Sequence, residues 1–258
     1  MASERAPGDP GADETVWGRK PVLEWLESAP GRIESVVVQR GGKGGALGKV
    51  LDVCRRQGVR FRLAERAELE REVPPGVNHQ GVAARLAPAP LSSLDDLLDG
   101  VAEAPLPVLL ALDQVQDTGN LGALARSLLA LGGAGLLLPR HGSARLGGGA
   151  SKASAGALAR LPVAHVTNLA KSLDVCRDRG LFVYGAAGGG GNALSAYGLD
   201  PAFPCVLVLG NEEKGLRPNV AKRCDALVEI PMPGGFESLG VAQAGAMLLA
   251  LLARAQWM

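Results

Sequence analysis

The segment Val206-Leu-Val-Leu-Gly-Asn-Glu-Glu-Lys-Gly-Leu216 runs from an apolar strand straight into a polar turn. Gly210 lets the backbone approach a ligand closely, and free N–H and C=O groups in the turn can hydrogen-bond to it. In α/β proteins, ligand sites lie outside the carboxyl ends of parallel strands. We therefore expect a parallel sheet here, with a binding site at the end of this strand.

Short apolar segments of the same kind surround this strand. Strands are expected at Val108 to Asp113, Gly135 to Leu138, Leu181 to Tyr184, Cys205 to Leu209 and Ala226 to Ile230, and helices at about Gly119 to Leu131 and Leu239 to Ala255. Alternating strands and helices predict an α/β domain whose mostly parallel sheet is covered on both faces.

A smaller α/β series precedes this one. It comprises expected strands at Val36 to Val38, Val59 to Leu63 and Gly81 to Leu86, with a helix at Leu47 to Gln57. We divide the chain into a disordered tail (1–14), a small α/β domain (15–87), a linker with a short helix (88–105) and the larger domain (106–258).

Charge is distributed unevenly along this chain of 258 residues, whose formal net charge is only +1. Between Arg32 and Arg62 there are eight basic residues and two acidic ones. This excess indicates either a surface facing phosphates or an ordinary solvated helix face.

The four cysteines form no C-x-x-C pair, and no histidine lies at zinc-ligand spacing, so we expect neither a metal site nor a disulfide framework. No signal peptide or apolar run of about 20 residues is present. We therefore expect a soluble cytoplasmic protein without a membrane partner.

Two glycine clusters resemble phosphate loops only loosely. Lys43 to Val50 lacks the first Gly and the final Ser or Thr of a Walker A motif. Gly188 to Ala193 matches a loose G-x-G-x-x-A, but Ser195 to Pro204 offers no convincing helix to receive a pyrophosphate. Neither cluster supports a nucleotide site.

Two further segments carry polar groups into turns of the larger domain. Leu112-Asp-Gln-Val-Gln-Asp-Thr-Gly-Asn120-Leu-Gly-Ala-Leu-Ala-Arg126-Ser127 places a polar turn between a buried strand and a helix. The plainer interpretation is that Asp117 or Asn120 caps this helix and Arg126 is a surface cation. Ile230-Pro-Met232-Pro-Gly-Gly-Phe-Glu-Ser238-Leu239-Gly240-Val241 is an irregular loop leading into the last helix.

In order and rough spacing, these three segments resemble the signature motifs of the SpoU (TrmH) RNA 2'-O-methyltransferases. The resemblance covers about Leu106 to Leu252, and Val16 to Leu86 resembles the ribosomal-protein-like substrate-binding domain of the rRNA-modifying branch. It implies a deep trefoil knot in the larger domain, a homodimer, S-adenosylmethionine as cofactor and structured RNA as substrate. A guanosine ribose of large-subunit rRNA is favoured over tRNA, because the tRNA branch typically extends the catalytic core with helices instead.

The resemblance also assigns roles to individual residues. Asn120, Arg126, Glu212 and Ser238 match catalytic positions, and Gly210, Ile230, Met232 and Leu239 match positions at the cofactor. The third motif departs from the family pattern Ser-Leu-Asn-Val-Ser, because Gly240 and Ala242 replace its Asn and second Ser. The alternative hypothesis is therefore a knotted RNA-binding protein that keeps the cofactor pocket but has reduced or lost turnover.

The role of Arg126 stays open between two chemistries. The family assigns it removal of the ribose 2'-hydroxyl proton, but an ordinary guanidinium is protonated near pH 7 and is a poor base. Alternatively, Arg126 clamps an RNA phosphate while Asn120 orients the hydroxyl. The two residues are six positions apart, about 600° around a helix, so they would meet only through a bent helix start or across a dimer.

Overall fold

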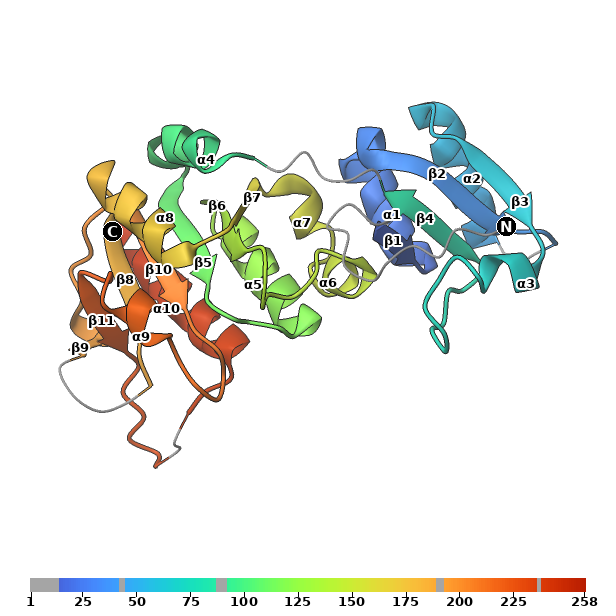
Figure 1. Cartoon of the computed structure of the whole chain (residues 1–258). Helices are drawn as coiled ribbons and strands as arrows, with labels where there is room; N and C mark the ends of the chain where they lie inside the picture. Colours follow the sequence, from blue (N-terminus) through green and yellow to red (C-terminus); the bar gives the residue numbers. More distant parts are fainter. Residues whose placement is uncertain (1–13, 42–44, 87–91, 189–192, 236–237) are drawn as a thin grey trace. The chain divides into compact units, whose positions relative to one another are not determined.

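A computed structural model describes residues 14–41, 45–86, 92–188, 193–235 and 238–258. The chain forms two compact units, one made of residues 1–90 and 146–152, the other of residues 91–145 and 153–258. Figure 1 labels the helices and strands of both units.

The N-terminal unit contains a four-stranded sheet in the order β1-β4-β2-β3. Its elements are β1 (Glu14–Trp17), α1 (Arg19–Ser28), η1 (Pro30–Arg32), β2 (Ile33–Gln39), α2 (Gly45–Gln57), β3 (Phe61–Ala64), α3 (Arg66–Leu69) and β4 (Val82–Leu86). Only the β2–β3 pair is parallel. The expected strands and helix are confirmed, whereas β1 and α1, separated by Gly18 at a φ of 94°, were not predicted.

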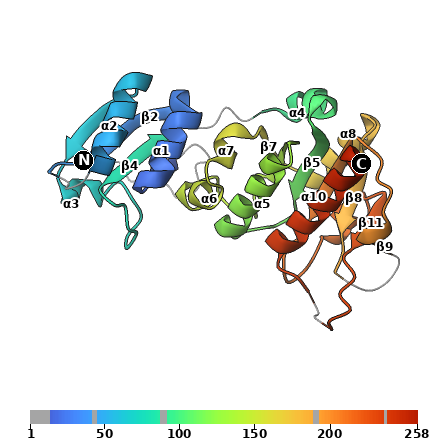
Figure 2. The same cartoon turned by 180° about the vertical axis from the view of Figure 1, so that it is seen from behind.

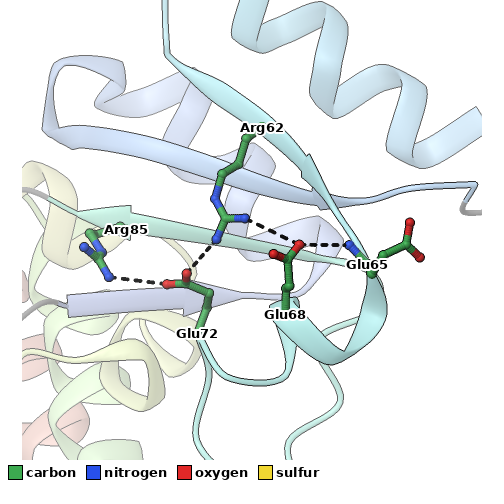
Figure 3. Close-up of polar contacts among 5 residues, drawn as sticks. All are labelled: Arg62, Glu65, Glu68, Glu72 and Arg85. Carbon is green, nitrogen blue, oxygen red and sulfur yellow. Dashed lines mark hydrogen bonds and ion pairs between the residues drawn. The ribbon is translucent and has the colours of Figure 1, made fainter. Parts of the chain in front are cut away.

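A charged network covers one face of this sheet beside α3. Arg62 Nη2 lies 2.7 Å from Glu72 Oε1, and the other oxygen of Glu72 lies 3.3 Å from Arg85 Nη2. A more distant pair joins Arg62 to Glu68 at 3.9 Å (Figure 3). The carboxylates of Glu72 and Glu68 thus neutralise Arg62, the arginine of β3 that points to this face.

The C-terminal unit contains a seven-stranded sheet in the order β7-β6-β5-β10-β8-β11-β9, and every pairing in it is parallel. Its strands are β5 (Leu106–Leu112), β6 (Gly133–Pro139), β7 (Val163–Val166), β8 (Phe182–Ala186), β9 (Leu194–Ser195), β10 (Cys205–Leu209) and β11 (Ala226–Glu229). Its helices are α4 (Leu94–Gly100), η2 (Val101–Glu103), α5 (Thr118–Ala130), α7 (Ala157–Arg160), α8 (Leu169–Asp178), η3 (Ala196–Gly198), α9 (Pro218–Ala221) and α10 (Val241–Trp257), and α6 (Gly148–Ala153) spans the division between the units. The predicted α/β class and parallel sheet are confirmed.

Both faces of this sheet are covered, as the apolar strands predicted. On one face, Leu109 and Ala111 of β5 pack in a core with residues of α4 and α8. On the other face lie α5 and α10, which are side by side in Figure 2. The trefoil knot stays a prediction, because strand order does not define how a loop is threaded.

Several elements of this unit were not predicted, and β7 and α8 are the main ones among them. The strand is only four residues long and includes His165, whose pKa burial lowers. Residues 189–192 and 42–44 of the two glycine clusters lie outside the described residues. Between Ser195 and Pro204 the chain forms only the short turn η3, in agreement with the absence of an expected helix.

Candidate active site

The first and second motifs meet at the carboxyl edge of the parallel sheet. Their strands β5 and β10 are neighbours, with Leu112 opposite Leu209. Just beyond them, Asp113 N–H donates to the Leu209 carbonyl at 2.7 Å, and Asn211 Nδ2 donates to the Gln114 carbonyl at 3.2 Å. Turns about a hundred residues apart in sequence are therefore held side by side.

The turn after β10 closes on itself. Asn211 and Gly215 exchange backbone hydrogen bonds of 3.1 and 2.9 Å, and Asn211 Oδ1 accepts from the backbone N–H groups of Glu213 and Lys214. A Cβ on Gly210 would lie 2.3 Å from the Gly215 carbonyl carbon. Glycine is thus required at position 210 by the fold of the turn itself, whatever ligand it approaches.

Asn120 reaches from the first motif to the acid of the second. Asp117 caps α5 by accepting from Asn120 N–H at 2.7 Å, which settles which residue is the cap. The Asn120 side chain is thereby free to donate from Nδ2 to Glu212 Oε1 at 2.5 Å. Two predicted catalytic residues, 92 positions apart, form one hydrogen-bonded pair.

Arg126 lies apart from this pair. It is exposed on the regular part of α5 and makes no ion pair or side-chain hydrogen bond with any residue that the structure describes. Because α5 is helical from Thr118 onward, no bent start brings Arg126 round to Asn120 within one chain.

An ion pair between a buried carboxylate and a partly exposed arginine was not predicted. Asp113 is 0% exposed, and its carboxylate accepts from the backbone N–H of Arg217 at 2.9 Å and from its Nε at 2.7 Å. Arg217 Nη2 completes the contact at 2.7 Å. The pair fastens the end of the second motif to the end of β5. A carboxylate directly after a fully buried strand is the sequence signal that would have found it.

Three backbone positions expected at the cofactor are available for binding. The backbone groups of Gly210, Ile230 and Leu239 make no hydrogen bond to another described residue, although Ile230 is only 8% exposed. Buried backbone groups are nearly always paired, so the buried Ile230 in particular suits a ligand that presents donors and acceptors. Met232 is half-buried beside them and Ser238 is exposed. The residues fit S-adenosylmethionine, whose adenine edge can be held by main-chain groups.

The departure in the third motif lies at the start of α10. Gly240 is the N-cap residue, with φ −58° and ψ 147°, and no side chain caps the helix there. A Cβ at this position would meet only the flexible end of Gln243, at 2.5 Å from Oε1. The backbone therefore accommodates the Asn of the family pattern, and its loss is not forced by the fold.

Within the described ranges, no group of three or more His, Cys, Asp or Glu side chains is arranged to hold a metal ion. None of the helices described is both long and apolar enough to cross a membrane.

Comparison with known proteins identifies the family. Residues 107–250 match the model of the SpoU rRNA Methylase family, and residues 15–92 match that of RNA 2'-O ribose methyltransferase substrate binding. A tRNA/rRNA methyltransferase of Mycobacterium avium is 39% identical over 241 residues, which cover 93% of this chain and 77% of the relative. One of Mycobacterium ulcerans is 38% identical, with 98% and 81% covered. The chain belongs to the SpoU family of RNA methyltransferases, as predicted, and is an enzyme of that class.

Solved structures share the fold. The SpoU methyltransferase AviRb of Streptomyces viridochromogenes in complex with AdoMet has a TM-score of 0.75 at 23% identity, covering 98% of this chain and 94% of that one. An AdoMet-bound rRNA methyltransferase of Sinorhizobium meliloti has a TM-score of 0.75 at 23% identity, covering 94% and 87%. A TrmH/SpoU tRNA modifying enzyme of A. aeolicus covers only 63% of this chain and 81% of its own, with a TM-score of 0.53 at 24% identity.

Proposed function

We propose that this protein methylates the 2'-hydroxyl of a ribose, a guanosine in large-subunit rRNA, with S-adenosylmethionine as methyl donor. The observation that carries the proposal is the Asn120–Glu212 hydrogen bond at the carboxyl edge of the sheet, beside backbone groups free to hold the cofactor. Residues 15–87 bind the RNA and residues 106–258 carry the catalytic site. The free cysteines suit the reducing cytoplasm.

The chain's own residues have to position the ribose hydroxyl, whose proton passes to the exposed Glu212 carboxylate or to water as the oxygen takes the methyl group. The bound cofactor supplies an electrophilic methyl group on a sulfonium. The Glu212 carboxylate fixes the Asn120 amide by accepting from Nδ2, which leaves Asn120 Oδ1 free to accept the 2'-hydroxyl hydrogen. A hydroxyl held in line with the methyl group gains the rate advantage of orientation.

Arg126 acts as a phosphate clamp in this proposal. Arg126 has no carboxylate partner in the described part of the chain, and an exposed guanidinium of this kind is suited to bidentate binding of a phosphate. Because a single chain does not bring Arg126 to Asn120, we propose that the arginine of one protomer serves the site of the other in a homodimer.

Transfer of tritiated methyl groups to unmodified RNA tests the reaction. We expect wild type to label large-subunit rRNA, ribose-methylation mapping to locate one 2'-O-methylated guanosine, and Arg126→Ala to lose most of the label while binding cofactor normally. Label on a base, or in tRNA alone, would contradict the proposed specificity.

Mixing two inactive variants tests the shared site. If Arg126 acts across the dimer, a mixed dimer of Asn120→Ala and Arg126→Ala chains has one site with both native residues and regains activity. If both residues act within one chain, every site in the mixed dimer carries one substitution and the mixture stays inactive. Co-purification of the untagged variant through an affinity tag on the other variant confirms that subunits have exchanged.

Two alternatives follow from particular observations. The relatives are named tRNA/rRNA methyltransferases, so tRNA is the second candidate substrate. The rRNA methyltransferase of Sinorhizobium meliloti covers 94% of this chain and the tRNA modifying enzyme only 63%, which favours rRNA. The missing Asn and Ser of the third motif support the other alternative, an RNA-binding protein with cofactor pocket but low turnover.

A further inference from the structure

The N-terminal unit exposes apolar side chains along one edge strand. β3 pairs only with β2, so the outer side of β3 is an open edge. Phe61 and Leu63 are 36% and 46% exposed, and among the described residues of this unit they are the large apolar side chains that are exposed. Being two positions apart in a strand, they share one face of the sheet.

Arginines adjoin this apolar pair at the corner between α2 and β3. The Arg55 guanidinium lies 5.5 Å from the centroid of the Phe61 ring. Arg56 follows it in the last turn of α2, and Arg60 immediately precedes Phe61; all three are exposed. Cations at a helix C-terminus also interact favourably with the helix dipole, but that interaction does not account for an exposed aromatic ring beside them.

Two of the three arginines at this corner lack a carboxylate partner among the described residues, whereas Arg55 pairs with Asp52 at 2.8 Å. Arg62, which alternates to the opposite face of β3, is occupied by Glu72 and Glu68 (Figure 3). In contrast, Arg56 and Arg60 form no ion pair and no side-chain hydrogen bond with the residues described in the structure. Unpaired positive charge therefore lies at this corner, on Arg56 one position from Arg55 and on Arg60 one position from Phe61.

We propose that this corner, defined by Arg55, Arg56, Arg60, Phe61 and Leu63, binds unpaired nucleotides of the substrate RNA. Phe61, with the Arg55 guanidinium beside it, stacks on a base, and Arg56 and Arg60 contact flanking phosphates. An exposed aromatic ring among cations is the arrangement that single-stranded nucleic acid requires, because each base offers a π-face and each link a negative charge. The inference rests on the proposed RNA substrate and adds where, and in which form, the RNA is bound.

Binding of a hairpin RNA with an unpaired loop, compared with a blunt RNA duplex, tests the proposal on the full chain. We expect the hairpin to bind more tightly, because bases stacked inside a duplex cannot reach Phe61. Phe61→Leu keeps an apolar side chain but removes the ring, so hairpin affinity should fall about 5- to 150-fold, the range for loss of one stacked base. Phe61→Trp restores a ring and should bind like wild type.

The salt dependence of RNA binding tests the proposed phosphate contacts. Arg56→Ala/Arg60→Ala should reduce the slope of log affinity against log salt concentration by about 1 to 2. The matched control is Lys20→Ala/Arg66→Ala, which removes the same charge from side chains that are 87% and 73% exposed in the same unit. The control should keep the wild-type slope, and circular dichroism establishes that every variant is folded.

Three results would overturn the proposal. The first is equal hairpin affinity of the Phe61→Leu and Phe61→Trp variants, and the second is equal salt slopes for the two double variants. The third is self-association of the wild type that Phe61→Leu abolishes, because it would identify a second copy of the chain as the occupant. Kinetics separate this failure from failure of the proposed function. The corner variants should raise the KM for RNA while kcat and cofactor affinity stay unchanged. If the wild type methylates RNA and the corner variants have the same KM for RNA as the wild type, only this inference is refuted. If the wild type transfers no methyl group, the proposed function is refuted.

Discussion

The hydrogen bond between Asn120 and Glu212 makes a sharp prediction at the scale of single residues. Asn120→Ala removes the group that orients the hydroxyl, and Glu212→Gln removes the charge that fixes the amide. We expect either change to lower kcat by about 100-fold, the usual effect of losing one positioned hydrogen-bonding group, with little change in cofactor affinity. Glu213→Gln is the matched control, because its side chain is exposed one position away. A kcat of Asn120→Ala equal to that of the control would exclude a catalytic role.

The Asp113–Arg217 pair predicts a loss of stability. Asp113→Asn leaves the Arg217 charge without its carboxylate behind the site, and because the arginine side chain is 39% exposed we expect about 1 to 3 kcal/mol of destabilisation, less than for a fully buried pair. Urea unfolding measures it. Asp99→Asn, which breaks the exposed Arg179–Asp99 pair, should change stability by less than about 1 kcal/mol. Equal effects of the two changes would argue against the structural importance of the buried carboxylate.

At the scale of elements, the start of α10 decides between an active and a degenerate enzyme. Gly240→Asn restores the family side chain, and Gly240→Asp caps the helix without restoring the amide. If turnover was lost with the Asn, the Asn variant should gain methyl transfer at least about tenfold over the Asp variant. Equal rates of wild type, Asn and Asp variants would show that position 240 does not limit catalysis.

The contact of α10 with α5 and β10 depends on Gly245. A Cβ there would lie 2.3 Å from Leu124 Cδ2 and 2.5 Å from Leu209 Cδ1, inside a packed core. We expect Gly245→Ala to destabilise the protein by about 1 to 3 kcal/mol despite the better helix propensity of alanine. Gly48→Ala in the exposed part of α2 meets nothing within 4 Å and should stabilise by about 0.5 to 1 kcal/mol. Thermal unfolding shows whether each variant is less or more stable than the wild type. A Gly245→Ala variant more stable than the wild type would contradict this packing.

At the scale of the whole molecule, the thiols report whether both units keep their cores closed. Burial raises the pKa of Cys54 to about 11 and those of Cys176, Cys205 and Cys224 to about 12. Since the thiolate is the reactive form, the native protein at pH 8 should react slowly with a disulfide reagent and release four equivalents only on unfolding. Rapid labelling of several cysteines in the native state would show that these cores open readily.

The sequence by itself determined the fold class, the larger strands and the family. The apolar runs that became β5 and β10 are short, bounded by polar turns and buried on both faces, so local pattern and tertiary environment agree. The motif after β10 was also recognisable, because the turn's glycine is fixed by a local steric requirement. Shorter elements such as β1 and β7, with four residues each, escaped because so few residues show no reliable period.

Only the tertiary structure decided which polar groups meet. Parallel pairing of β5 with β10 brings Asn120 to Glu212 and Asp113 to Arg217, contacts between residues 92 and 104 positions apart. It also separates Arg126 from that pair within one chain, and it shows which arginines of the basic stretch are neutralised and which are not. Such partnerships depend on strand order and on the direction in which each side chain leaves its element, and neither is encoded in the local pattern of residues.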